Sequence, residues 1–226
     1  MLQVLTATGG RSEAFALCHR WMRAQDFPGK IVWFIVDDGP QPSKIEPMPK
    51  NWLQVVIRRA PFWRPGQNTQ ALNLLRGLAA IDPAHPVVLI EDDDHYAPDW
   101  LTHIEAQLER AEVVGEGKAR YYNVATRQGR QLRNGMHASL CSTALRGRAI
   151  ETLRQSCKRA PKFIDLDLWQ KHRSRHVFDG HRVVGIKGMP GRGGIGMGHK
   201  DGFKGDHDPD GALLRQWIGD DARHYL

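Results

Sequence analysis

Cysteines are scarce in this 226-residue chain, and long apolar runs are absent. The three cysteines, Cys18, Cys141 and Cys157, are an odd number at wide spacing, which fits neither a disulfide framework nor a zinc site. We therefore expect buried thiols without a chemical role. No apolar run approaches the roughly 20 residues that a membrane-spanning helix needs. The first residues lead directly into a strand-like segment instead of a signal peptide, so we expect a cytoplasmic protein.

Acidic side chains are scarce in the second half of the chain. Residues 1–113 hold 11 Lys and Arg against 14 Asp and Glu, whereas residues 114–226 hold 21 against 11. The formal net charge of +7 therefore comes from the second half. Such asymmetry indicates a polyanionic partner such as nucleic acid, a phosphorylated glycan or an anionic membrane, although solubility and one bound diphosphate explain it equally well.

Internal repeats are also absent, and strands alternate with helices instead. Strands are predicted over 3–7, 31–36, 53–57 and 87–90, and helices over 13–25, 68–81 and 98–112, with Ser12 capping the first helix and Pro98 opening the third. This alternation predicts an α/β fold with a mostly parallel sheet flanked by helices. Ligands of such sheets bind outside the carboxyl ends of the strands.

The pattern changes after residue 115. A hairpin is predicted over 121–134 with its turn near Gly129, followed by helices over 146–157 and 165–173. Residues 185–205 are rich in glycine and are expected to form a loop.

Two predicted strands end in acidic clusters, Asp37-Asp38 and Glu91-Asp92-Asp93-Asp94. Adjacent carboxylates repel one another, so the second cluster is costly unless a cation or hydrogen-bond donors compensate it. Carboxylate oxygens suit Mg²⁺ or Mn²⁺, either of which would bridge to a nucleotide diphosphate. The alternatives are a solvated acidic loop for the second cluster and an ordinary turn residue for Asp38.

The segment from Val88 to Leu101 resembles the DXD segment of family 2 and related GT-A glycosyltransferases, in which an apolar strand, an acidic cluster and a Pro-Asp pair follow one another. The resemblance places Asp93 at the metal-binding aspartate, with Asp94 as a second candidate ligand. Glu91 matches the acid that often faces the nucleotide ribose, although the family usually has Asp there. Either Glu91 or Asp92 would then support Asp93.

The resemblance, which covers roughly residues 2–175, also implies the fold, the donor and the division of the chain. It implies a GT-A (Rossmann-like) domain over 1–226, with a nucleotide-sugar-binding half over 1–114 and a basic acceptor-binding half over 115–226. The donor would be a UDP-sugar, bound with Mn²⁺ or Mg²⁺. The residues that match the family's nucleotide site are Thr6, Ala7, Thr8, Arg11, Asp37, Asp38, Glu91 and Asp92.

Two later segments complete the expected site. Residues 163–169 are similar to the family segment that carries the catalytic base, so Asp165 is expected to take the proton of the acceptor hydroxyl; a plain helix N-cap is the alternative. In the Gly-rich stretch, Arg192 and Lys200 are expected to bind the diphosphate. His199 is expected to be a further metal ligand, because several GT-A enzymes supply a late histidine.

The sequence indicates the acceptor less directly than the donor, because GT-A enzymes glycosylate many kinds of acceptor on one fold. Residues 118–175 hold 14 Lys and Arg against three acids, near the aromatic residues Tyr121, Tyr122, Phe163 and Trp169. Such a surface suits a phosphate backbone and an extruded base. We therefore expect a phage-type enzyme that glycosylates a hydroxymethylated DNA base in the host cytoplasm. The alternative is a transferase of cell-surface saccharide or lipopolysaccharide.

Two further classes remain open. A nucleotidyltransferase would also use Mg²⁺ and paired carboxylates but would carry a Gly-rich phosphate loop after the first strand, of which Gly9-Gly10-Arg11 is a thin version. A non-catalytic nucleic-acid-binding module would explain the positive charge but not the acids at the strand ends.

Overall fold

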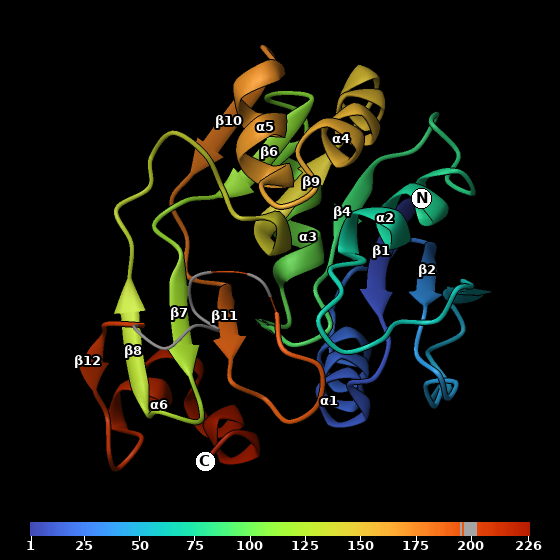
Figure 1. Cartoon of the computed structure of the whole chain (residues 1–226). Coiled ribbons are helices and arrows are strands. Elements are labelled where there is room, and N and C mark those ends of the chain that lie inside the picture. Colours follow the sequence, from blue (N-terminus) through green and yellow to red (C-terminus); the bar gives the residue numbers. More distant parts are fainter. Residues whose placement is uncertain (195, 197–202) are drawn as a thin grey trace.

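A seven-stranded sheet crosses the structure, a computed structural model that describes residues 1–194, 196 and 203–226. Its strands are β1 (Leu2–Thr8), β2 (Ile31–Asp37), β3 (Trp52–Arg58), β4 (Val87–Leu89), β6 (Val113–Glu116), β9 (Thr143–Leu145) and β10 (Arg175–Phe178). They lie in the order β10-β6-β9-β4-β1-β2-β3 (Figure 1). All pairings are parallel except those of β9, which runs antiparallel to both β4 and β6. The expected mostly parallel sheet is confirmed.

A second sheet lies at the lower left of Figure 1. Its strands are β5 (His95–Tyr96), β7 (Arg120–Asn123), β8 (Gln128–Gln131), β11 (Val183–Lys187) and β12 (Asp206–His207), in the order β12-β8-β7-β11-β5. Strand β5 directly follows the acidic cluster and pairs antiparallel with β11. This pairing brings the late segment that contains Lys187 beside the cluster.

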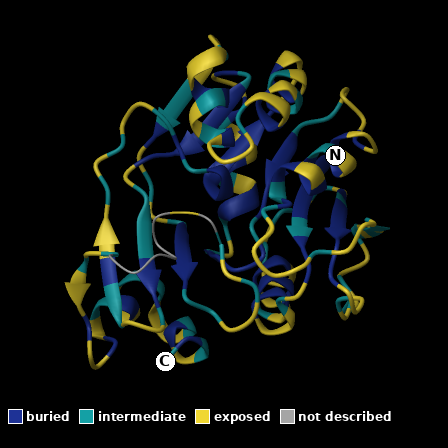
Figure 2. Cartoon of the chain, in the orientation of Figure 1, coloured by how far each residue is buried: buried dark blue, intermediate teal, exposed yellow. Residues whose placement is uncertain are grey.

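Helices cover both faces of the seven-stranded sheet and form a hydrophobic core on each. They are α1 (Ser12–Arg23), α2 (Gln70–Leu78), α3 (Trp100–Gln107), α4 (Arg148–Arg159) and α5 (Ile164–Lys171). The remaining α-helix of the described residues, α6 (Ala212–Ile218), packs against the second sheet, where Trp217 lies against Arg120 of β7. Helices α1 and α3 pack in one core with Val4 of β1, whereas α2, α4 and α5 pack in the other with Leu5. Side chains of a strand alternate between faces, so β1 contributes to both cores. Figure 2 shows the buried residues concentrated in the strands and on the inner helix faces.

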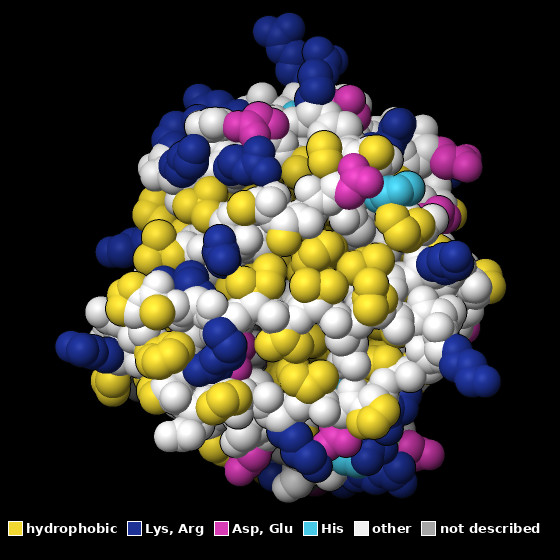
Figure 3. Space-filling view, turned by 90° about the vertical axis from the view of Figure 1, so that its right-hand side faces the viewer, with side chains coloured by type: hydrophobic (Ala, Val, Ile, Leu, Met, Phe, Trp, Pro, Cys, Tyr) yellow, Lys and Arg dark blue, Asp and Glu magenta, His cyan; other side chains and the backbone are white. Residues whose placement is uncertain are grey.

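Several apolar side chains remain exposed at the edge of the sheet. Leu53 and Val56 of the edge strand β3 are 60% and 43% exposed. Figure 3 views the molecule from the right-hand side of Figure 1, and it shows hydrophobic side chains gathered in the middle of that face.

None of the helices in the described part of the chain has the length and apolar character needed to cross a bilayer.

The three cysteines are buried and free, as expected. Two helix boundaries differ from prediction. Ser12 is the first residue of α1 instead of its cap, and Arg11, at the N-cap position, makes no capping hydrogen bond through its side chain. Helix α3 begins at Trp100, beyond Pro98, and ends at Gln107. Val113 and Val114, close to its expected end, are instead fully buried in β6, where β-branched side chains pack well.

Two glycine-based expectations are also corrected. Gly185 lies within β11 instead of a loop, and a Cβ at this position would lie 2.4 Å from a ring carbon of Tyr121. The expected hairpin is present, but its turn spans 124–127 and Gly129 lies within β8. A Cβ on Gly129 would lie 2.5 Å from Leu213 Cδ2. Both glycines permit close packing within a sheet instead of making a turn.

Candidate active site

The acidic cluster Glu91–Asp94 follows β4 at the edge where the parallel strands end. Thr8, the last residue of β1, donates a hydrogen bond to Asp92 Oδ2 at 2.7 Å. Asp37, the last residue of β2, lies at the same edge. Carboxyl ends of parallel strands meet at one edge of a sheet, which brings together three predicted site segments from distant parts of the sequence.

Arg11 supplies a positive charge to the middle of the cluster. Its Nη1 atom lies 2.7 Å from Asp92 Oδ1 and 3.1 Å from Asp93 Oδ2, and its side chain is only 12% exposed. Burial disfavours the charge of the guanidinium, but the carboxylates of Asp93 and Asp92 outweigh burial and hold the pKa of Arg11 above its usual value. Burial also raises the pKa of Asp92, against the opposing effect of Arg11.

Lys187 supplies a second buried charge at the other end of the cluster. Asp94 Oδ1 accepts hydrogen bonds from the Ile186 backbone N–H at 2.8 Å and from Lys187 Nζ at 3.2 Å. Burial and the neighbouring Asp94 raise the pKa of Glu91 to about 8. Gln70 Nε2 donates to Glu91, so each acid of the cluster has a partner within the chain.

The carboxylates suit a hard divalent ion only in part. In the described part of the chain, the group with ligand atoms close enough to hold a metal is Glu91, Asp94 and Cys141, all within 4.8 Å of one another. A thiol is a soft ligand, and burial holds the pKa of Cys141 well above its usual value, so oxygen-seeking Mn²⁺ or Mg²⁺ would use the carboxylates alone. Asp93 contacts Arg11 instead, and the predicted ligand His199 lies outside the described residues, as does Lys200.

Asp37 and Asp38 are buried and hydrogen-bonded within the chain. Asp37 accepts bonds from the backbone N–H groups of Gly39 at 2.8 Å and Ser43 at 2.7 Å. Asp38 forms ion pairs with Arg59 at 2.8 Å and with Arg192 at 2.9 Å. Burial opposes the charge of Asp38, but its hydrogen bonds, including one from Thr69, prevail and lower its pKa.

The segment 188–194 crosses over the turn between β1 and α1. The Arg192 backbone N–H donates to Gly10 O at 3.1 Å, and Arg11 Nε donates to Arg192 O at 2.7 Å. The Arg192 guanidinium lies 5.1 Å from the centroid of a Trp63 ring. Gly191 has φ +98°, and a Cβ there would lie 2.7 Å from Gly10 O, so the close crossing requires glycine. Arg192 thus lies at the predicted nucleotide site.

The other two predicted nucleotide contacts lie on β1. Thr6 is fully buried, and its hydroxyl accepts a hydrogen bond from Trp33 Nε1 at 2.9 Å. Ala7 is half-buried beside it. The side chain of Thr6 therefore packs in the protein core, whereas Thr8 reaches the acidic cluster directly.

Asp165 lies in the first turn of α5, where its Oδ1 accepts a hydrogen bond from the Leu166 backbone N–H at 2.8 Å. No hydrogen bond or ion pair joins it to the acidic cluster within the described residues. A short chain of contacts connects the two regions: Gln70 bonds Glu91, and the nearby Asn68 bonds Pro161 O at 3.3 Å. The loop before Asp165 and the acidic cluster therefore both contact residues at the start of α2.

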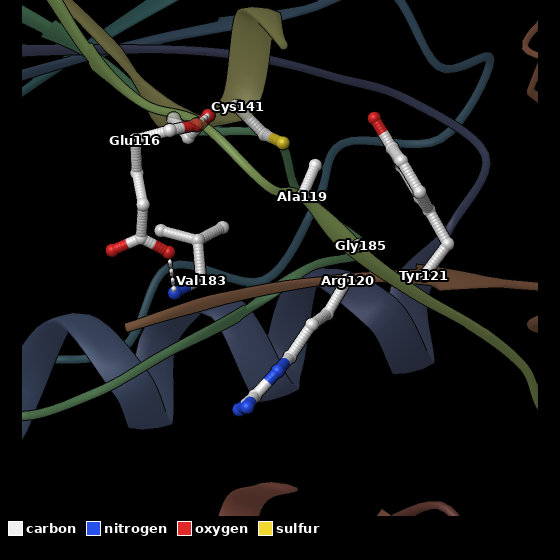
Figure 4. Close-up of a pocket in the computed structure, with 8 residues that line it drawn as sticks. Glu116, Ala119, Arg120, Tyr121, Cys141, Val183 and Gly185 are labelled. Carbon is white, nitrogen blue, oxygen red and sulfur yellow. Dashed lines mark hydrogen bonds between the residues drawn. The ribbon is translucent and has the colours of Figure 1, made fainter. Parts of the chain in front are cut away.

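A small cavity lies between the two sheets (Figure 4). Its volume is about 10 Å³, and its lining includes Glu116, Tyr121 and Cys141. Glu116 accepts hydrogen bonds from the backbone N–H groups of Arg182 and Val183 across this region, and burial raises its pKa. A space of this size holds at most one water molecule, so it is not the donor site.

Some residues at the site were not singled out as site residues from the sequence. Thr69 and Gln70 come from the start of α2, and Arg59 follows β3. Their only signal was polarity at the end of a strand or the start of a helix. Lys187 lies in the Gly-rich stretch 185–205 that was expected to form a loop, and the apolar residues Val183, Val184 and Ile186 before it were a signal for the strand that the structure shows.

The fold is shared with solved structures of nucleotide-sugar complexes. No protein-family model matches the sequence, and no curated protein matches it. Similar structures include TarS of S. aureus (TM-score 0.59, 12% identity over 82% of this chain and 36% of that chain) and TarS 1–349 in complex with UDP-GlcNAc (0.58, 13%, 88% and 61%). Another is the mannosyltransferase PcManGT from Pyrobaculum calidifontis in complex with GDP-Man and Mn²⁺ (0.52, 12%, 84% and 57%). The chain spans less than two thirds of the length of these structures. The TM-scores show a common fold, and at 12–13% identity the likeness extends to the fold alone.

Proposed function

We propose that this protein is a metal-dependent glycosyltransferase that moves a sugar from a UDP-sugar to an acceptor hydroxyl. The main support is the acidic cluster Glu91–Asp94 at the carboxyl edge of the parallel strands, in a fold shared with structures bound to UDP-GlcNAc and to GDP-Man. Buried carboxylates and buried cations cost free energy to bring together at a strand end, and groups of this kind concentrate at functional sites.

Each part of the site has a role in this proposal. Asp38 and Thr8 would contact the nucleoside, and Arg11 and Arg192 would bind the diphosphate through their guanidinium groups. Asp93 and Asp94 would hold Mn²⁺ or Mg²⁺, which supplies charge stabilisation to the leaving diphosphate. The carboxylates must exchange their present partners for these ligands, because Arg11 and Lys187 now neutralise them.

Asp165 is the proposed general base. Its carboxylate removes the proton of the acceptor hydroxyl while that oxygen forms the bond to the anomeric carbon and the bond to the diphosphate oxygen breaks. Attack opposite the leaving group inverts the anomeric configuration. This arrangement needs one carboxylate apart from the metal-binding acids, and Asp165 on α5 is separate from the cluster.

The proposed acceptor is a hydroxymethylated base in DNA, with the protein working in the host cytoplasm. Its support is the excess of cations on the acceptor half of the chain. A cell-surface saccharide or lipopolysaccharide is the second candidate, since the same cations would contact phosphorylated sugars or anionic lipids.

The test is calorimetric titration of UDP into the wild type with and without Mn²⁺. We expect Mn²⁺-dependent binding that Asp93→Asn abolishes and Asp165→Asn preserves, while Asp165→Asn loses sugar transfer. Asp179→Asn is the matched control, because Asp179 is exposed and pairs only with Lys118 in the described part of the chain. Wild-type affinity in Asp93→Asn rejects the metal assignment.

Product analysis separates the remaining classes. A nucleotidyltransferase would release pyrophosphate from a nucleoside triphosphate, whereas the proposed enzyme releases UDP. Mn²⁺-dependent hydrolysis of a UDP-sugar would exclude a non-catalytic nucleic-acid-binding module.

A further inference from the structure

The net positive charge of the chain is concentrated in residues 146–175, a segment that contains two antiparallel helices and the residues that flank them. Residues 146–175 hold nine Lys and Arg against three acids, an excess of six out of the total of +7. Helices α4 and α5 lie antiparallel, because Thr152 near the start of α4 contacts His172 just past the end of α5, and Arg159 at the end of α4 pairs with Asp167 near the start of α5. Lys and Arg side chains are visible across the top of the molecule in Figure 3.

A groove of about 380 Å³ runs between these helices. It is lined by Arg148, Glu151, Thr152, Gln155, Arg159 and Lys171. The one acid of the lining is already neutralised, because Glu151 bonds Arg154 and accepts a hydrogen bond from Gln155 at 2.6 Å. Arg148 and Lys171 are exposed and form no ion pair within the described residues. Uncompensated positive charge therefore comes from Arg148 and Lys171, at the start of α4 and the end of α5, whereas Arg159 at the other end of the groove pairs with Asp167.

We infer that this groove binds the phosphodiester backbone of the nucleic-acid acceptor, an inference that rests on the proposed function. The helical rise of 1.5 Å per residue gives about 16 Å between Arg148 and Arg159, the length of about five phosphates along one strand of a duplex. The groove is shallow and open, so an extended polyanion can lie along it. Phosphate contacts of this kind position the nucleic acid without reading its sequence.

The geometry also directs the bound strand toward the proposed base. Arg159 and Asp167 mark the end of the groove at the start of α5, which is also where Asp165 lies. Phe163 and Leu166, on either side of Asp165 in the sequence, are 64% and 39% exposed. An exposed aromatic ring suits stacking on a base that has left the duplex. Of the four aromatic residues expected near the acceptor, Tyr122 and Trp169 are instead buried, as Tyr121 largely is.

The test is fluorescence anisotropy with a labelled DNA duplex in the absence of donor, over a range of salt concentrations. We expect Arg148→Glu/Lys171→Glu to weaken binding by about 10- to 100-fold and to reduce the slope of log K against log salt by about two, because two phosphate contacts are lost. The matched control is Lys30→Glu/Lys50→Glu, which makes the same change in net charge at two exposed positions just before β2 and β3. It should keep the wild-type slope.

Two results would overturn the inference. One is equal loss of DNA affinity in both double variants, which would show only an effect of net charge. The other is a wild-type protein that binds phosphatidylserine vesicles but not DNA, with the vesicle binding abolished in Arg148→Glu/Lys171→Glu. That result would make the groove a lipid-headgroup site. UDP titration into the same proteins without DNA tests the donor site separately, so failure of the groove and failure of the proposed function are distinguishable.

Discussion

Removing the charge of Arg11 should destabilise the protein strongly and make its stability depend on a divalent ion. The guanidinium contacts Asp92 and Asp93 and is nearly buried, so Arg11→Met leaves two buried carboxylates without their cation. Breaking a buried ion pair by removing one partner costs about 3–5 kcal/mol. For a chain of this size, 1 kcal/mol corresponds to about 2–4 °C, so we expect the melting temperature to fall by roughly 10 °C.

The assay is thermal unfolding followed by circular dichroism, first with a chelator and then with increasing Mn²⁺. In Arg11→Met the ion no longer competes with a guanidinium, so Mn²⁺ should raise the melting temperature more than in the wild type. An ion present at 100 times its Kd stabilises by about 2.7 kcal/mol, which would recover much of the loss.

Two variants make this result specific. Arg11→Lys keeps the charge but loses the forked geometry and should fall between wild type and Arg11→Met. Arg20→Met removes an exposed arginine from α1, the helix that follows Arg11, and should be nearly neutral. If Arg11→Met melts within about 2 °C of the wild type, or if Mn²⁺ shifts both proteins equally, then Arg11 does not compensate the acids that bind the ion.

Three further predictions concern other parts of the molecule. Burial lowers the pKa of His19 from 6.5 to about 4, so its contribution to stability is complete above pH 6.5 and is lost as the pH falls toward 4. His19→Leu should therefore remove about 3 kcal/mol from the change in the free energy of unfolding between these pH values, measured by denaturant unfolding. An unchanged dependence of the free energy of unfolding on pH would contradict this prediction. Gly191→Ala should detach segment 188–194 and speed tryptic cleavage after Arg192, whereas Gly193→Ala, with nothing near its added Cβ, should cleave like the wild type. Phe163→Ala should raise KM for a DNA acceptor several-fold with the donor KM unchanged, and an equal rise in both would refute an acceptor role.

The parallel part of the fold could be predicted from the sequence because its signals are local. Apolar runs such as 31–36 and 87–90 each contain a strand, and the acids that follow them mark the carboxyl edge. The second sheet could not be predicted in the same way, because β5 and β12 are two residues long and exist only through long-range pairing. Gly185 and Gly129 were expected in a loop and a turn. Their positions in strands could not be predicted, because the side chains that pack on them come from distant segments of the sequence.

The candidate site shows the same limit. The sequence could place Asp92 at a strand end, but the cation that pairs with it could not be identified. Arg11 precedes Asp92 by 81 residues and Lys187 follows Asp94 by 93. The contacts of Arg192 with Asp38 span 154 residues, and no periodicity or motif records such a pairing. The roles of Asp93 and Asp165 stay predictions, which the UDP titration tests for Asp93 and the sugar-transfer assay for Asp165.

The antiparallel strand β9 has a consequence for how the chain reaches its native state. β9 lies between β4 and β6, so the edge of β4 stays unpaired until residues 143–145 arrive, although β4 itself ends at Leu89. During synthesis, more than fifty residues must follow β4 before its open backbone groups find their partner. A nascent chain arrested before β9 therefore carries an exposed strand edge that favours association with other chains. Ribosome-bound chaperones would be most needed over this interval of elongation.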